Sequence, residues 1–259
     1  MIRVRNLRKK YGPVSVLEGL NLDVKQGEIL VILGRSGVGK SVLLRQIIGI
    51  EKPDEGYVEV DGVNISELPP AKLYQAVKNM GMLFQGSALF DSMNIEENTA
   101  FYLSQHGDPH TGKKFSKAEL KEKVQEALSL VGLHGVENKM PSDLSGGMKK
   151  RAALARLIIY RPSILLYDEP TTGLDPLTAQ QINELIVTIQ NELKGTSIIV
   201  THDIHSALYV ADRLALHKDG KIAYVDEPEA FLKIDDPIIS FFNEILTHHP
   251  RARKETKNV

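Results

Sequence analysis

The sequence predicts a three-layer α/β fold with a helical region inserted near its middle. Short apolar segments alternate with helical patterns in both end regions of the 259-residue chain, as expected for a sheet covered by helices. Between about residues 93 and 159, helical periodicity dominates instead. The net charge of -1 provides no basic field for nucleic acid, and the absence of cysteine excludes disulfides and thiol chemistry.

The first part of the chain is expected to begin with strands. Residues 2–7 and 20–24 have strand patterns, and Gly12-Pro13 between them is typical of a turn. Residues 29–33 are all apolar and rich in branched side chains, which predicts a strand buried on both faces. A helix over 41–50 follows and ends near Gly49 and Pro53, and short strands are expected at 57–60 and 81–84.

The rest of the chain continues with helices and then alternates again. Helices are expected at 95–103, 117–131 and 146–159, with an exposed polar loop at 104–115. Strands follow at 164–167, 197–200 and 214–217, and a helix over 176–193 has proline in its first turn. A strand pair flanks the hairpin signal Asp219-Gly220, and a helix covers 237–246. The basic tail, 247–259, is either a disordered end or a contact to another subunit or to anionic lipid headgroups.

A glycine-rich loop follows the strand at 29–33 and has the spacing Gly34-x-x-x-x-Gly39-Lys40-Ser41. Its glycines let backbone N–H groups turn towards phosphate oxygens, and the next helix presents its positive end to them. Lys40 supplies a cation to the β- and γ-phosphates, and Ser41 supplies a hydroxyl to Mg²⁺. The alternative is a glycine-rich turn that matches the spacing by chance. The buried strand before the loop and the helix after it favour the phosphate-binding loop, because that loop requires both and a chance turn does not.

Two adjacent carboxylates, Asp168 and Glu169, end the apolar strand at 164–167. Asp168 is a candidate to hold Mg²⁺ through water, and Glu169 is a candidate to orient or deprotonate an attacking water. A capped strand end is the structural alternative. Because a phosphate-binding loop is also present in the chain, two adjacent carboxylates at a strand end indicate a site that hydrolyses a nucleotide.

The segment Leu144-Ser145-Gly146-Gly147-Met148 opens the helix expected at 146–159. Ser145 and the two glycines form a helix start that can receive phosphate oxygens on free N–H groups. Ser145 can equally be an ordinary N-cap, and the two roles are compatible.

The order of these motifs along the chain is the glycine-rich loop, then 144–148, then the acidic pair. In this order they resemble the motifs of the ATP-binding-cassette (ABC) ATPases over residues 11–226. The resemblance implies a P-loop NTPase (RecA-like) core with an N-terminal antiparallel β subdomain and an inserted α-helical subdomain. It places an ABC transporter ATP-binding domain at 1–246, its helical subdomain at about 93–159, and a flexible tail at 247–259. It also implies ATP and Mg²⁺ as cofactors, and two copies that clamp two ATP molecules head to tail.

The resemblance assigns a role to each matching residue. Glu169, His202 and Lys40 would be catalytic, and Ser41, Gln85 and Asp168 would support the metal. Tyr11 would stack on adenine, although a turn-packing role is the alternative, and Ser145, Gly147 and Asp175 would act across the dimer interface. The nucleotide contacts would be made by Tyr11, Gly34, Ser36, Gly37, Gly39, Lys40, Ser41, Val42, Gln85, Ser145, Gly147 and Asp175.

Residues 86–93, directly after Gln85, resemble the Mla/Mkl subfamily, which energises transfer of phospholipids or other lipids between membranes with Mce-domain proteins. Met148, where most of the family has glutamine, fits the same group. Leu89 and Phe90 lie where membrane subunits would dock, although they can also be core residues. ATPase subunits of importers for amino acids or metals share much of this pattern and remain an alternative.

The resemblance implies partners as well as chemistry. We expect a homodimer, integral membrane permease subunits, an Mce-domain lipid-binding protein and a small regulatory subunit, at the cytoplasmic face of the inner membrane. A soluble ABC ATPase acting on ribosomes or DNA is disfavoured, since the chain has one uninterrupted cassette and no heptad run.

Overall fold

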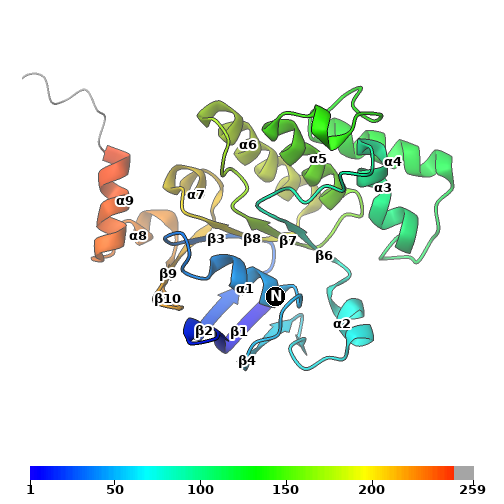
Figure 1. The fold of residues 1–259 in the computed structure, drawn as a ribbon. Coiled ribbons are helices and arrows are strands. Elements are labelled where there is room, and N and C mark those ends of the chain that lie inside the picture. Colours follow the sequence, from blue (N-terminus) through cyan, green and yellow to red (C-terminus); the bar gives the residue numbers. More distant parts are fainter. Residues whose placement is uncertain (248–259) are drawn as a thin grey trace, which may run out of the picture.

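A computed structural model describes residues 1–247, in which a central six-stranded sheet separates two layers (Figure 1). The sheet has the strand order β10-β9-β3-β8-β7-β6, and all neighbours are parallel except β10 and β9. The strands are β3 (Ile29–Leu33), β6 (Met80–Leu83), β7 (Ile164–Asp168), β8 (Thr196–Thr201), β9 (Arg213–Lys218) and β10 (Lys221–Asp226).

A four-stranded antiparallel sheet and helix α1 (Lys40–Ile47) lie on one side of the central sheet. The antiparallel sheet has the order β2-β1-β4-β5, and it confirms the expected N-terminal β subdomain. Its strands are β1 (Ile2–Tyr11), β2 (Val14–Val24), β4 (Glu55–Val60) and β5 (Val63–Asn64).

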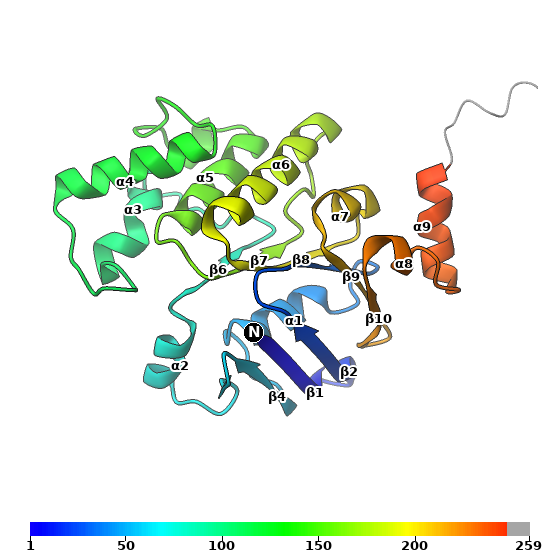
Figure 2. The same cartoon turned by 180° about the vertical axis from the view of Figure 1, so that it is seen from behind.

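Helices cover the opposite face of the central sheet, and Figure 2 shows this layer from behind. They are α3 (Ile95–His106), α4 (Lys117–Leu130), α5 (Gly146–Ile158), α6 (Pro176–Leu193) and α7 (Ile204–Val210), with a short 3₁₀ turn at Pro141–Asp143. Helices α3, α4 and α5 pack on one another, which fits the predicted inserted helical region. Helices α8 (Pro228–Phe231) and α9 (Pro237–Thr247) flank the β9–β10 end of the sheet.

Strand β3 divides its side chains between two apolar cores. Val31 and Leu33 face the helical layer, whereas Leu30 and Ile32 face α1 and the antiparallel sheet. All four are 0% exposed, as predicted for a strand buried on both faces.

The parallel order brings four loops to one edge of the sheet. Strands β3, β8, β7 and β6 are adjacent, so their carboxyl ends, at Leu33, Thr201, Asp168 and Leu83, meet at the same edge. Ligands of open α/β sheets bind at such an edge.

The structure differs from the predicted elements in a few places. Helix α2 (Pro70–Val77) was not predicted; none of its residues is fully buried, although Leu73, Ala76 and Val77 form a half-buried apolar face against the core. The short elements α7, α8 and β5 were not predicted either. Residues 104–106 continue helix α3, so the predicted loop at 104–115 begins later than expected. No helix within residues 1–247 has the length and apolar character to cross a membrane, and the tail beyond 247 lies outside the described residues.

Removal of a buried side chain from α1 tests this layered core. Leu43 is 0% exposed, so Leu43→Ala should lower the free energy of unfolding by about 2–5 kcal/mol in urea denaturation. Leu177→Ala is the matched control, since Leu177 is 70% exposed, and it should change the value by less than about 0.5 kcal/mol. Equal losses in the two variants would contradict the assignment of Leu43 to the core.

Candidate active site

The glycine-rich loop is shaped by positions where a side chain would not fit. Gly39 has a φ of 105°, and a Cβ atom there would lie 2.5 Å from Cγ1 of Val16. Helix α1 begins directly after it, at Lys40. The loop therefore joins β3 to the positive end of α1, as predicted, and its free N–H groups are available to an anion.

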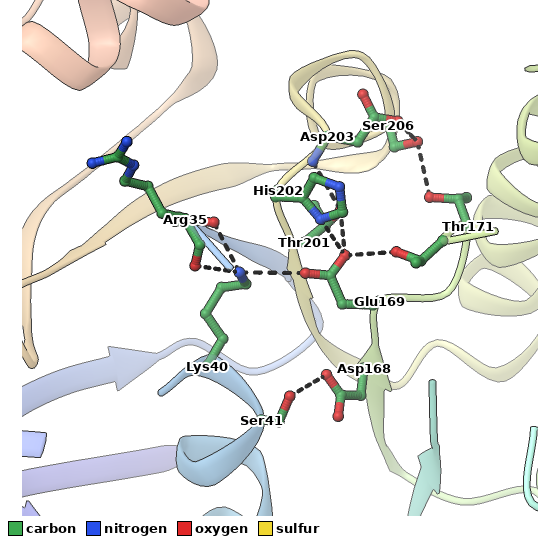
Figure 3. Close-up of polar contacts among 12 residues, drawn as sticks. Arg35, Lys40, Ser41, Asp168, Glu169, Thr171, Thr201, His202, Asp203 and Ser206 are labelled. Atoms are coloured by element: carbon green, nitrogen blue, oxygen red, sulfur yellow. Dashed lines mark hydrogen bonds and ion pairs between the residues drawn. The ribbon is translucent and has the colours of Figure 1, made fainter. Parts of the chain in front are cut away.

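The Lys40 ammonium lies inside this loop and is 6% exposed. It donates to the backbone carbonyls of Gly34 at 2.8 Å and Arg35 at 3.1 Å, and it forms an ion pair of 3.3 Å with Glu169 (Figure 3). A buried cation held by neutral carbonyls and one carboxylate is a natural partner for phosphate oxygens.

The hydroxyl of Ser41 donates to Asp168 Oδ1 at 2.8 Å. Burial raises the pKa of Asp168, and this hydrogen bond opposes the shift only in part. A half-buried hydroxyl and a buried carboxylate beside a phosphate loop form a suitable donor set for a cation. Residues 1–247 contain no group of three or more His, Cys, Asp or Glu side chains able to hold a metal alone. Mg²⁺ is usually held by one or two carboxylates, with substrate phosphate oxygens and water completing its shell.

Glu169 is held by several side chains at the end of β7. Its Oε2 accepts hydrogen bonds from Thr172 at 3.0 Å and Thr201 at 3.4 Å, and it lies 2.9 Å from His202 Nδ1. The residue has a φ of 47°, in the left-handed region. Burial opposes ionisation, but the hydrogen bond from His202 and the charge of Lys40 together lower the pKa of Glu169. The result is an ionised, fixed carboxylate suited to bind and orient a water.

A cavity of about 440 Å³ joins these groups. Tyr11 lies at its rim, 43% exposed, with its hydroxyl bonded to Glu51. Of the predicted residues, the cavity is lined by Tyr11, Ser36, Gly37, Gly39, Lys40, Ser41, Val42, Gln85, Glu169 and His202. Gly34 and Asp168 adjoin it through the contacts with Lys40 and Ser41.

The other three predicted residues do not line this cavity. Ser145 is the N-cap of α5 and accepts from the Met148 N–H at 3.3 Å. Gly147 packs against α6, since a Cβ there would lie 2.6 Å from Cγ2 of Thr178. Asp175 is the N-cap of α6 and accepts from the Thr178 N–H at 3.0 Å. Within one chain these residues have structural roles, and their predicted contact with a second copy's nucleotide stays a prediction.

Several residues of the site were not predicted. Thr172 and Thr201 hold Glu169, and Val16 and Arg45 line the cavity. Thr172 and Thr201 lie directly beside predicted motifs and Arg45 lies one helical turn after Ser41, whereas nothing in the sequence points to Val16.

Comparison with known proteins agrees with this geometry. The ABC transporter family matches residues 17–172. A dimeric ATP-binding cassette in a post-hydrolysis state, with ADP and Pi bound, superimposes with a TM-score of 0.79 at 32% identity, covering 88% of this chain and 98% of that one.

Curated relatives with similar sequence identity to this chain are named for the transport of different substances. A probable ribonucleotide transport ATP-binding protein, mkl, of Mycobacterium leprae is 40% identical over 93% of this chain and 68% of its own length. The intermembrane phospholipid transport ATP-binding protein MlaF of Haemophilus influenzae is 39% identical, over 91% and 87%. A methionine import ATP-binding protein of Clostridium tetani is 40% identical, over 90% and 71%. The chain thus spans about two thirds of the length of its mycobacterial relatives.

The environment of Glu169 predicts a pH-dependent stability. Its pKa lies below the ordinary value of 4.5, so its contribution is present above that value and is lost as the pH falls through the lower folded-state pKa. The free energy of unfolding of the wild type should therefore fall relative to that of Glu169→Gln between about pH 7 and pH 3. Urea denaturation across this range measures the difference in unfolding free energy between the two proteins. A difference that stays constant, or that shifts in favour of the wild type as the pH falls, would contradict the lowered pKa of Glu169.

Proposed function

Because the chain belongs to the ABC transporter family of ATPases, we propose that it powers the transfer of phospholipid or another lipid between membranes. In this proposal it works as a homodimer at the cytoplasmic face of the membrane that holds its permease. The observation that carries the cargo assignment is the segment at 86–93 together with Met148, which resembles the Mla/Mkl pattern.

Binding of ATP is assigned to the loop after β3. Backbone N–H groups of the loop and the Lys40 ammonium would bind the β- and γ-phosphates, exchanging carbonyl contacts for phosphate oxygens. The ring of Tyr11 at the rim of the cavity would stack on the adenine.

Mg²⁺ is assigned to Ser41, Asp168 and Gln85. Ser41 and Asp168 already face each other, and Gln85 lines the same cavity. When bound, the ion would neutralise charge on the phosphate oxygens.

Hydrolysis is assigned to Glu169 and His202. Glu169 would orient the attacking water and accept its proton, while Thr172 and Thr201 hold the carboxylate in place. His202 would keep Glu169 ionised through its Nδ1 contact and present its other ring nitrogen to the γ-phosphate.

The second half of each site is assigned to a second copy of the chain. Ser145 and Gly147 at the start of α5, and Asp175 at the start of α6, do not line the cavity of their own subunit. The free N–H groups at the start of α5 are suited to phosphate oxygens, so we place them against the ATP held by the partner.

The lipid assignment depends on the segment after Gln85, because overall identity does not separate the candidate cargoes. Phe90 is 40% exposed and therefore accessible to a membrane subunit, whereas Leu89 is half-buried against the helical core. The 39% identity to a phospholipid transport protein over nearly its whole length supports this proposal. An importer of amino acids or other small solutes is the second candidate, and a methionine import subunit of similar identity favours it.

The role of Glu169 predicts a separation of binding from turnover. Glu169→Gln should retain ATP binding, lower the rate of hydrolysis by about 10²-fold or more, and accumulate as an ATP-bound dimer. Single-turnover hydrolysis and sedimentation measure the two effects. Wild-type turnover by the variant would remove Glu169 from its role.

The cargo is tested by isolating the chain with its native membrane partners and analysing the complex by mass spectrometry. We expect a permease, an Mce-domain protein, a small regulatory subunit and bound phospholipid. A periplasmic amino-acid-binding protein in place of the Mce-domain protein would overturn the lipid assignment and leave the ATPase assignment intact.

A further inference from the structure

A buried lysine of α5 reaches from the helical layer to the loop after β6. Lys150 is 4% exposed, and its ammonium donates to the backbone carbonyl of Gln85. Within the described chain, the Lys150 side chain forms no other hydrogen bond and no ion pair. Burying an ammonium with one neutral hydrogen-bond partner costs free energy. If the contact with Gln85 were only structural, a neutral donor at this position would make it at a lower cost.

The nearby carboxylates explain how this charge is tolerated. Burial lowers the pKa of Lys150, and the charges of Asp168 and Glu169 oppose that shift. The ammonium therefore lies in the field of the two carboxylates predicted to serve the metal and the attacking water. Any change in net charge at those carboxylates acts on Lys150 through a medium of low dielectric constant.

A second cation of the same helix holds the next carbonyls of the loop. Arg156 donates to Ala88 at 2.8 Å and Ser87 at 3.1 Å, and its guanidinium lies 5.4 Å from the centre of the Phe90 ring. Ser87 and Ala88 have φ values of 64° and 51°, which residues with a Cβ seldom adopt. The loop conformation thus depends on these contacts rather than on local preference.

The far end of the loop is fixed by a buried amide. Asn98, 0% exposed on α3, accepts from the Phe90 N–H at 2.8 Å and donates to the Phe90 carbonyl at 3.0 Å. The segment 85–90 is therefore held by α5 at Gln85 and by α3 at Phe90. Gln85 lines the nucleotide cavity, so the contact with Lys150 is the one nearest that cavity.

We propose that Lys150 is a positioning residue that couples the charge at the nucleotide site to the placement of residues 85–90. This inference rests on the proposed function, in which that segment contacts the permease. Nucleotide binding changes the net charge beside Asp168 and Glu169, and the Lys150 ammonium moves in response. Because this ammonium is hydrogen-bonded to the Gln85 carbonyl, Gln85 and the residues after it move with it. The charge of Lys150 is essential to this role, not only its hydrogen bond.

A label beside Phe90 tests the coupling directly. The chain has no cysteine, so Asp91→Cys, at an exposed position, accepts one environment-sensitive fluorophore. A non-hydrolysable ATP analogue with Mg²⁺ is added to this protein and to the same protein carrying Lys150→Gln or Lys150→Met. Lys149→Met is the matched control, because Lys149 is the preceding residue of the helix and its side chain forms no hydrogen bond or ion pair within residues 1–247.

We expect the analogue to shift the emission of the protein with Lys150 and of the Lys149 control. Both Lys150 variants should lose at least about four fifths of the shift while binding the analogue with a Kd within about threefold of the parent. Lys150→Gln retains a donor without the charge, so it separates charge from hydrogen bonding and is the variant better able to fold.

Three results would overturn the coupling: a full shift in Lys150→Gln, no shift in the parent protein, or an equal loss in Lys149→Met. Failure of the parent protein to bind the analogue would contradict the nucleotide site itself. The identity of the cargo does not affect any of these outcomes, so the coupling and the lipid assignment fail independently.

Discussion

The ion pair between Lys40 and Glu169 is the contact around which the rest of the site is arranged. It joins the loop after β3 to the end of β7, two strands that are neighbours only through β8. A buried lysine and a buried glutamate stabilise each other only when further hydrogen bonds satisfy both. The carbonyls of Gly34 and Arg35 serve the lysine, and Thr172, Thr201 and His202 serve the glutamate. In the proposed function, phosphate oxygens take the place of the carbonyls at Lys40.

This arrangement follows from strand order. Strands β3, β6, β7 and β8 are far apart in the sequence, but the sheet places their carboxyl ends at one edge. The chemistry of four separate loops is thereby concentrated in one cavity, while the residues at the starts of α5 and α6 do not line it. The cavity at this edge is therefore separate from the starts of α5 and α6, which we propose complete the site of a second copy.

The sequence allowed the β–loop–helix unit at 29–41, the acidic strand end and the central sheet to be predicted, because each depends on local patterns that physical chemistry restricts. Gly39 is an example, since its φ and the contact with Val16 exclude a side chain. Other features were not predictable. Helix α2 has no buried residue, and the roles of Thr201 and Lys150 depend on contacts between segments distant in the chain. A lysine in a helix is ordinarily read as a solvated residue, and only packing shows that Lys150 is buried.

A crystal structure of Glu169→Gln with ATP and Mg²⁺ would show whether the nucleotide binds at Lys40. We expect the Lys40 ammonium to lie within hydrogen-bonding distance of a β- or γ-phosphate oxygen, with residue 169 facing the γ-phosphate. We also expect Ser145 of a second copy to contact the same nucleotide. A nucleotide bound away from Lys40, or a complete site within one copy, would contradict the proposed site.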